Sequence, residues 1–464
     1  MAAACATNPA TGKRQLMLIS EGQEAAMGKE ADDQFHGLYG EFPDSRVQAY
    51  VESVARPLAA VSERPALPWT FRVVDDPQVN AFALPGGYVY VTRGILAHMN
   101  SEAELAGVLG HEIGHVTARH SASSQSRQLL GMVGLGVGMI LSPTLREGGD
   151  ALSQAFGLVF LKFGRDQESQ ADSLGLRYIV RKDYDPKEML DVFKMLDGVT
   201  QAGGNRMPNW LSTHPAPPNR LADISRAIKD QGVTGSRVGR DEFISHVDGL
   251  VFGENPREGF FREQVFYHPD LAFTLTFPQG WTTQNEKQGV SAMAPNPNKD
   301  AMLQLTLSTG EPEAAARAFA GRPGVQAGQP QRRSAGGFPA SSLDFEMQDS
   351  RGGPIAGTVT FVKHGSNTFQ LLAYSAQARF PSYRATAESW VRSFDRLSDP
   401  RILAVRPMHI RIETLRAAST ISNLGHEWNS PVKVETLALI NAVTLTESIP
   451  AGSKVKRVVG ERIQ

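Results

Sequence analysis

The stretch that decides the fold is NSEAELAGVLGHEIGHVTARH, residues 100–120. It contains HEIGH (111–115), in which two histidines stand four residues apart and a glutamate directly follows the first. The stretch contains no proline, and Ser101 and Glu104 have the spacing of a capping box. A helix that begins near residue 101 and carries HEIGH is therefore predicted.

The same helix has glycines at intervals of three and four. Gly107, Gly110 and Gly114 lie on one face of it. A glycine inside a helix costs about 1 kcal/mol relative to alanine. Three on one face predict that another backbone packs closely there, which places the helix at the centre of its domain.

The HEIGH spacing is suited to binding a metal ion. Residues four apart lie on one helical face, so the rings of His111 and His115 can converge on one ion. Neutral imidazole is a good ligand for Zn²⁺. Glu112 is rotated by about 100° around the helix axis and can face a bound water. The pattern is typical of metal-assisted peptide hydrolysis, and the alternative is a solvated polar helix face.

A catalytic zinc takes three protein ligands and leaves one position for water, so a third ligand is needed. A metzincin would supply it through HExxHxxGxxH, but Ala118 and Ser121 stand where that motif needs glycine and histidine. His120 comes one residue too early and is predicted to point away from the ligand face. We expect it to be a surface or capping histidine at the helix C-terminus.

Glu168 is the better candidate for the third ligand. It begins ESQAD (168–172), so Glu168 and Asp172 share a helical face. Glu168 would bind zinc while Asp172 accepts a hydrogen bond from a ligand imidazole, most simply His111. Taken alone, this spacing is equally compatible with a solvated helix face.

The composition excludes several classes of protein. The 464 residues carry a net charge of −1 and show no block of Lys and Arg, so no nucleic-acid partner is expected. Cys5 is the single cysteine, which rules out an internal disulfide and a cysteine-based zinc finger. No stretch reaches the roughly 18 apolar residues of a membrane-spanning helix.

The N-terminal sequence MAAACATNPATGKRQLMLIS resembles the end of a bacterial lipoprotein signal, in which the cysteine becomes the lipidated first residue. Cys5 is thus a candidate lipidation site, and residues 1–19 are predicted to form a lipoprotein-like linker. The apolar region that precedes such a cysteine is missing. The alternative is a free cysteine in a flexible terminus.

The pattern along the chain predicts an α+β protein with three folded parts. Residues 20–250 read as a mainly helical lobe, in which 80–84 and 88–92 form a hairpin around Pro85-Gly86-Gly87. Residues 262–398 show the alternation of strands, followed by a helix at 388–397. Residues 405–464 are predicted to form a small separate unit or tail.

HEIGH, ESQAD and THPAPPNR (213–220) together resemble the gluzincin metallopeptidases of the HtpX and CAAX prenyl protease family, and most of all its periplasmic BepA-like lipoprotein branch. The resemblance covers about residues 5–230. It implies a mainly helical zincin-type lobe with a small sheet and one Zn²⁺ per chain. It also implies that His111, His115 and Glu168 bind the zinc and that Glu112 is the general base.

The same resemblance assigns two further residues. His214 matches a histidine close to the metal, which either hydrogen-bonds the transition-state oxyanion or occupies the open zinc position and keeps the enzyme latent. Arg220 matches an arginine that lines the site. The alternatives are a loop histidine before a proline and a surface arginine.

Two stretches near the site could handle substrate. If the strand that contains Asn80, Ala81 and Phe82 lies at a sheet edge beside the site, an extended peptide can pair with it. It could equally be a purely structural strand. LLGMVGLGVGMIL (129–141) is predicted to be either a glycine-hinged lid or a core helix.

The later parts carry looser resemblances. FTLTFPQGW (273–281) is similar to the start of PsbP-like or Mog1-like domains. The 405–464 tail looks like a diverged LysM module, which implies peptidoglycan as a possible partner.

These patterns favour a zinc endopeptidase of the bacterial envelope. It would hydrolyse unfolded or misassembled envelope proteins in the periplasm, attached to the membrane through a lipid anchor only. The alternatives are a chaperone-like protein, or a peptidoglycan-associated scaffold with little or latent proteolysis.

Overall fold

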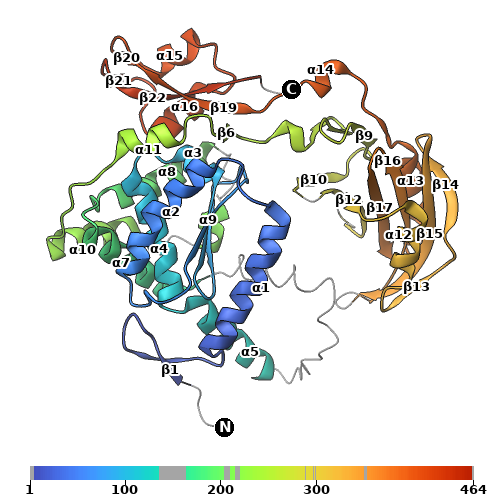
Figure 1. Ribbon diagram of the computed structural model, residues 1–464, viewed down its shortest axis with the longest axis horizontal. Coiled ribbons are helices and arrows are strands. Elements are labelled where there is room, and N and C mark those ends of the chain that lie inside the picture. Colours follow the sequence, from blue (N-terminus) through green and yellow to red (C-terminus); the bar gives the residue numbers. More distant parts are fainter. Residues whose placement is uncertain are drawn as a thin grey trace. The chain divides into compact units, whose positions relative to one another are not determined.

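The computed structural model contains two compact units. It describes residues 5–134, 163–202, 209–214, 220–287, 289–295, 297, 299–349 and 353–461. The first unit consists of Met1–Glu254 and Met408–Arg462, and the second of Asn255–Pro407 and Ile463–Gln464. Both combine helices with sheets (Figure 1), which confirms the predicted α+β class.

The helix that carries HEIGH lies at the centre of the first unit. It is α4 (Glu102–Thr117), and all its residues are buried. The Ser101 side chain caps α4 by accepting a hydrogen bond from the Glu104 backbone N–H at 3.0 Å. The Glu104 carboxylate accepts from the Asn100 N–H at 2.6 Å, one residue before the position of a regular capping box. The other helices of the N-terminal part are α1 (Glu21–Tyr39), α2 (Ser45–Ala60), α3 (Arg93–His98), α5 (His120–Gly134), α7 (Arg165–Arg181), α8 (Glu188–Ala202), α9 (Asn209–Thr213), α10 (Arg220–Gln231) and α11 (Arg240–His246).

Other helices pack closely on the glycine face of α4, as the sequence predicts: Gly110 and Gly114 face α7, and Gly107 faces Met189 of α8. A Cβ at Gly110 would lie 3.2 Å from the Gly175 Cα, and one at Gly114 would lie 3.0 Å from the Ala171 carbonyl oxygen. Larger residues at these positions would push the two helices apart. The glycines thus bring the α7 backbone, with Glu168 on it, against the HEIGH helix.

A three-stranded sheet lies beside α4. Its order is β3 (Thr70–Val74), β5 (Tyr88–Thr92) and β4 (Ala81–Leu84). The predicted hairpin is confirmed, because β4 pairs antiparallel with β5 and Phe82 stands opposite Tyr90. β3 runs parallel to β5, so β4 is an edge strand of this sheet.

The N-terminal residues form a second hairpin, in which β1 (Cys5–Thr7) pairs antiparallel with β2 (Arg14–Leu16). The loop between the strands holds Asn8, which is 4% exposed. The Asn8 side chain donates to the carbonyl of Ala118, at the end of α4. The hairpin falls within the 1–19 stretch that the sequence predicts as a linker, and it packs on the helix that carries HEIGH.

The C-terminal segment belongs to the first unit. β19 (Met408–Thr414) pairs with both β6 (Val251–Phe252) and β22 (Lys454–Val459), so residues 408–461 continue a sheet that begins before the second unit. Figure 1 shows these elements, in red, beside α3 and α11. Their apolar residues share one core cluster with α2, α4 and α8. The remaining elements are β20 (Ser419–Thr420), α15 (Ile421–Glu427), α16 (Val434–Asn441) and β21 (Ser448–Ile449).

The second unit is rich in strands. Its larger sheet has the order β10-β11-β12-β17-β16-β15-β13, with β14 also paired to β15, and its smaller sheet has the order β18-β9-β8-β7. Helices α12 and α13 cover opposite faces of the larger sheet, because Leu371 packs in the cluster of α13 and its neighbour Leu372 in that of α12. The strand alternation predicted for 262–398 is confirmed, for example by β9, β12, β15, β16 and β17, and the helix predicted at 388–397 is found earlier, as α13. The bounds are η2 (Pro256–Glu258), β7 (Phe260–Arg262), β8 (Val265–His268), β9 (Phe273–Thr276), β10 (Thr282–Glu286), β11 (Gly289–Met293), β12 (Ala301–Ser308), α12 (Pro312–Ala320), β13 (Val325–Ala327), β14 (Gln331–Ala335), β15 (Phe338–Asp349), β16 (Gly353–His364), β17 (Asn367–Ala376), α13 (Phe380–Arg392), β18 (Asp395–Arg396) and α14 (Pro400–Leu403).

Within the described residues, no helix is both long enough and apolar enough to cross a membrane.

Candidate metal centre

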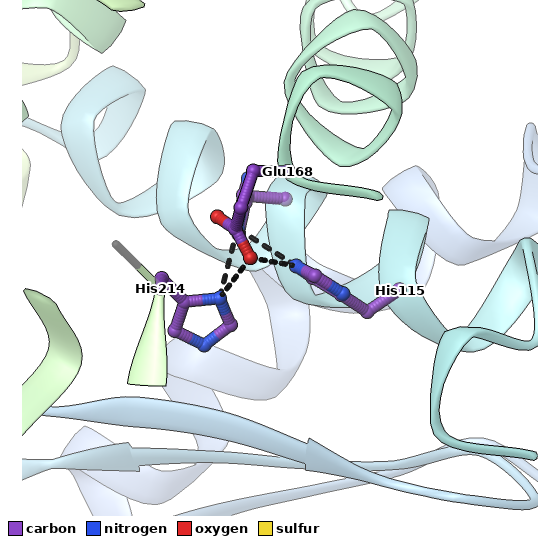
Figure 2. Close-up of side chains that lie close together, drawn as sticks. His115, Glu168 and His214 are labelled. Carbon is purple, nitrogen blue, oxygen red and sulfur yellow. Dashed lines mark hydrogen bonds and ion pairs between the residues drawn. The ribbon is translucent and has the colours of Figure 1, made fainter. Parts of the chain in front are cut away.

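Four potential metal ligands converge at the middle of the first unit. His111 and His115 come from α4, Glu168 from α7, and His214 from the residue after α9. One ligand atom from each lies within 4.8 Å of the others, and all four residues are buried. Figure 2 shows His115 and His214 directed at the Glu168 carboxylate.

The ligand atoms lie close enough together to bind one ion. The Nε2 atoms of His111 and His115 are 3.0 Å apart. The Glu168 carboxylate oxygens lie 3.6 Å from Nε2 of His111 and 3.5 Å from Nε2 of His115. Two imidazoles and a carboxylate are a ligand set of catalytic zinc.

The buried polar atoms fit a cation at this position. Glu168 is fully buried, and its Oε2 lies 3.1 Å from the Arg220 guanidinium and 3.6 Å from His111 Nε2. A buried carboxylate needs positive charge nearby, which Arg220 supplies in part and a metal ion would complete. Burial lowers the pKa of His115 well below its usual value, and repulsion from the neighbouring His111 adds to this shift. Its imidazole is therefore neutral and can offer a lone pair. The residues present thus fit zinc.

Asp172 orients His111. Its Oδ1 lies 2.9 Å from His111 Nδ1, which leaves Nε2 free for the metal. The Arg220 guanidinium holds the other side of the carboxylate, with Nε 2.7 Å from Oδ2. Burial by itself would raise the pKa of Asp172, but the hydrogen bonds from His111 and Arg220 outweigh it and lower the pKa below the usual value. Asp172 is therefore an anion that accepts from both partners.

Glu112 lies beside the ligands, within the same core. It is fully buried, and its Oε1 accepts a hydrogen bond from the Trp210 indole N–H at 3.0 Å. Its Oε2 has no hydrogen-bond partner. A buried carboxylate oxygen that is free to accept a proton is what a general base needs.

His214 and Arg220 also reach the centre. His214 Nδ1 is 3.1 Å from Glu168 Oε1 and 3.4 Å from His111 Nε2, and its Nε2 is 3.6 Å from Glu112 Oε1. Arg220 Nη1 is 3.1 Å from Glu168 Oε2. The structure thus brings His214 and Arg220, the two residues that the resemblance assigns to the site, into contact with the cluster.

The other predicted site residues lie outside this cluster. Asn80 directly precedes the edge strand β4, and its Oδ1 is buried without a hydrogen-bond partner. Ala81 and Phe82, in β4, are also buried. Cys5 opens β1 and pairs with Leu16. Of the predicted lid or core helix, 129–134 ends α5 and 135–141 falls outside the described residues.

His120 is placed differently from the sequence-based expectation of a surface or capping histidine. It is 2% exposed, and its Nδ1 lies 2.9 Å from Nδ1 of His115. The cause is Arg119, whose φ of 59° ends α4 and turns the chain before α5. The prediction assumed a continuous helix, in which His120 would point away from His115.

Trp210 was also not identified from the sequence as a residue of this site. Its contact with Glu112 joins two helices that are far apart in sequence. The tryptophan shortly before the His-Pro segment is the only signal that could have suggested a role for it, and a buried tryptophan is more often simply core.

Comparison with known proteins agrees with this centre. Residues 45–228 match the profile of "Peptidase family M48". The chain is 34% identical over 185 residues to the mitochondrial metalloendopeptidase OMA1 of Arabidopsis thaliana, covering 40% of this chain and 36% of that protein. It is 30% identical over 226 residues to the beta-barrel assembly-enhancing protease of Escherichia coli, covering 47% and 46%. The chain therefore spans only a third to a half of these two relatives.

A solved structure similar to part of the chain is cyanobacterial PsbP from Synechocystis. It is 13% identical with a TM-score of 0.24, and the match covers 29% of this chain and 91% of that one.

A longer match settles the family. The mitochondrial metalloendopeptidase OMA1 of Schizosaccharomyces pombe is 32% identical over 231 residues, which is 48% of this chain and 67% of that protein. The 45–228 region that matches the family profile contains HEIGH and ESQAD, which supply His111, His115 and Glu168 to the buried cluster. The chain belongs to peptidase family M48.

Proposed function

We propose that the chain is a zinc-dependent endopeptidase. The observation that carries this proposal is the convergence of His111, His115 and Glu168 in one buried cluster, with the Glu112 carboxylate beside it. Held by these ligands, zinc would supply a Lewis acid for the scissile carbonyl and lower the pKa of a bound water.

The chain's own groups then divide the remaining work. Glu112 accepts the proton of the attacking water on its free Oε2 and returns it to the leaving amine. Asp172 keeps His111 in the tautomer that exposes Nε2. Arg220 holds Asp172 and Glu168 in place through its three nitrogens.

Metal content tests this proposal directly. Elemental analysis of the purified protein is expected to find one zinc per chain, and His111→Ala is expected to lose most of it, because the ion loses one of the two imidazoles that α4 supplies. A matched control is His409→Ala, which changes a half-buried histidine outside the centre. A His111→Ala protein that retains a full equivalent of zinc would exclude this ligand set.

Of the two roles that the resemblance implies for His214, we propose that it keeps the enzyme latent. Its Nδ1 lies among the ligand atoms, where a fourth protein ligand would take the position of the water. His214→Ala is therefore expected to raise casein hydrolysis several-fold while zinc stays bound. Initial rates at matched zinc occupancy provide the measurement. A fall of tenfold or more would instead assign His214 to the oxyanion.

The substrate is an extended polypeptide. β4 has no strand beyond it in the described sheet, and pairing with a peptide's main chain would accept many sequences. Asn80, Ala81 and Phe82 would define that edge. We further propose that its substrates are unfolded or misassembled envelope proteins in the periplasm. A lipid on Cys5 would anchor the protein to the membrane. The support is the lipoprotein-like N-terminal sequence and the relatives named as beta-barrel assembly-enhancing proteases.

Peptidoglycan is a second candidate partner. In residues 408–461, the helices α15 and α16 lie in sequence between the antiparallel strands β19 and β22, and the two-residue strands β20 and β21 flank the helix pair. Two helices between paired outer strands suit the LysM-like resemblance. The full-length protein should then sediment with purified cell-wall sacculi. Absence from the pellet would remove this partner without affecting the peptidase.

A further inference from the structure

A line of polar contacts runs from His115 away from the metal cluster. His115 Nδ1 is 2.9 Å from His120 Nδ1, and His120 Nε2 is 2.8 Å from Gln170 Oε1. Two ring nitrogens that face each other at this distance share one hydrogen, so one donates and the other accepts. Which one donates decides whether His115 can bind a metal through Nε2.

Asn8 fixes the direction of this line. Its Oδ1 lies 2.9 Å from the backbone nitrogen of Ala10 and 3.2 Å from that of Thr11, and both can only donate. Its Nδ2 lies 3.3 Å from the carbonyl oxygen of Ala118, which can only accept. The amide group of Asn8 therefore has one possible orientation.

The orientation of the Asn8 amide determines the donor and acceptor roles of each group between it and the zinc site. Asn8 Nδ2 also lies 3.2 Å from Gln15 Oε1 and 3.4 Å from Gln170 Oε1, so its two hydrogens are shared among three oxygens. An NH₂ group of Gln170 facing this donor would be repelled, so Gln170 presents its carbonyl oxygen. That oxygen accepts from His120 Nε2–H, which leaves Nδ1 of neutral His120 as an acceptor. His115 must then donate from Nδ1, and its Nε2 lone pair faces the cluster.

We propose that Asn8, Gln170 and His120 are positioning residues that set the tautomer of His115, so that the N-terminal hairpin controls zinc affinity. This inference rests on the proposed zinc site. The two ligand histidines then differ: His111 is oriented by the charged Asp172, which can only accept, whereas His115 is oriented by neutral groups that could be reversed.

Two substitutions of Asn8 separate this role from simple support of the hairpin. Asn8→Asp keeps the acceptor for Ala10 and Thr11, so the turn survives. The new carboxylate cannot donate to Gln170, however, and attracts its NH₂ group. Gln170 would then donate to His120 Nε2, moving the hydrogen of His120 to Nδ1 and that of His115 to Nε2, which blocks the metal.

Asn8→Ala loses the turn contacts but leaves Gln170 free to keep its present orientation. A merely structural role thus makes Asn8→Ala the more harmful change, whereas the proposal makes Asn8→Asp the more harmful one. We expect Asn8→Asp to weaken zinc binding by about 10- to 100-fold, which is the usual range when a residue that hydrogen-bonds a metal ligand is changed. Asn8→Ala should weaken it by less.

Zinc affinity is measured on the full chain by competition with a chromogenic chelator, which requires no catalysis. The ¹⁵N shifts of the His115 ring in the metal-free protein report the tautomer. They are expected to show hydrogen on Nδ1 in the wild type and on Nε2 in Asn8→Asp. Melting of the metal-free variants shows whether the fold is intact.

A second pair of variants tests His120 itself. His120→Asn can keep an acceptor near Nδ1 and should retain most of the zinc affinity, whereas His120→Leu should lose as much as Asn8→Asp. Equal zinc affinity in wild type and Asn8→Asp, or weaker binding in Asn8→Ala than in Asn8→Asp, would overturn the proposal. A wild-type protein that binds no zinc would instead refute the proposed function.

Discussion

Glu112→Gln is expected to lower the turnover of casein about 1000-fold while the zinc content stays at one per chain. Glutamine keeps a side-chain oxygen that can accept the Trp210 N–H, so the local packing survives. It cannot take a proton from the attacking water, because an amide is not basic at neutral pH. The measurement is kcat with fluorescent casein, alongside elemental analysis of the same preparation.

The matched control is Glu21→Gln, which changes a side chain that is 67% exposed and whose nearest cation is 3.7 Å away. It should retain wild-type turnover. This comparison also separates a peptidase from a chaperone-like protein, since Glu112→Gln should still bind unfolded clients. Unchanged hydrolysis in Glu112→Gln would mean that this residue is not the base.

Lys456→Met is expected to lower the free energy of unfolding by about 3 kcal/mol or more. The Lys456 ammonium is buried and donates to the carbonyl oxygens of Ala97, Met99 and Ile440. Burial lowers its pKa, and the charge of Glu104 opposes that shift. Methionine fills the space but leaves three buried carbonyls without a donor, each a cost of roughly 1–3 kcal/mol.

Denaturant unfolding of the full-length protein measures this loss. Lys454→Met is the matched control on the same strand, because Lys454 is 35% exposed and its partner Asp241 is 3.6 Å away. It should change stability by less than about 1 kcal/mol. A Lys456→Met protein as stable as this control would show that the ammonium does not hold the C-terminal segment to α3.

The sequence predicted what depends on neighbouring residues. The HEIGH spacing places two rings on one helical face, and the three glycines of α4 predicted the close approach of another backbone, because both follow from helix geometry. The β4–β5 hairpin followed from a local turn signal, and β12, β15, β16 and β17 from local alternation. The third ligand came from a resemblance, since the ExxxD spacing at Glu168 is also common on solvated helices.

Other features needed the tertiary structure. His120 was assigned wrongly because a single positive φ at Arg119 redirects it, and no local pattern announces that turn. Trp210 reaches Glu112, and Asn8 reaches Gln170, across long stretches of chain. Such contacts depend on how whole helices pack, which residue spacing does not encode.

By itself, then, the sequence determined which side chains could bind a metal and on which face of α4 another backbone would approach closely, since a helix repeats every few residues. Only the tertiary structure decided which partners lie behind those ligands and that residues 408–461 complete the first unit. A buried lysine that needs three carbonyls, or an amide that fixes a distant imidazole, acquires its role only when separate elements exclude water around it.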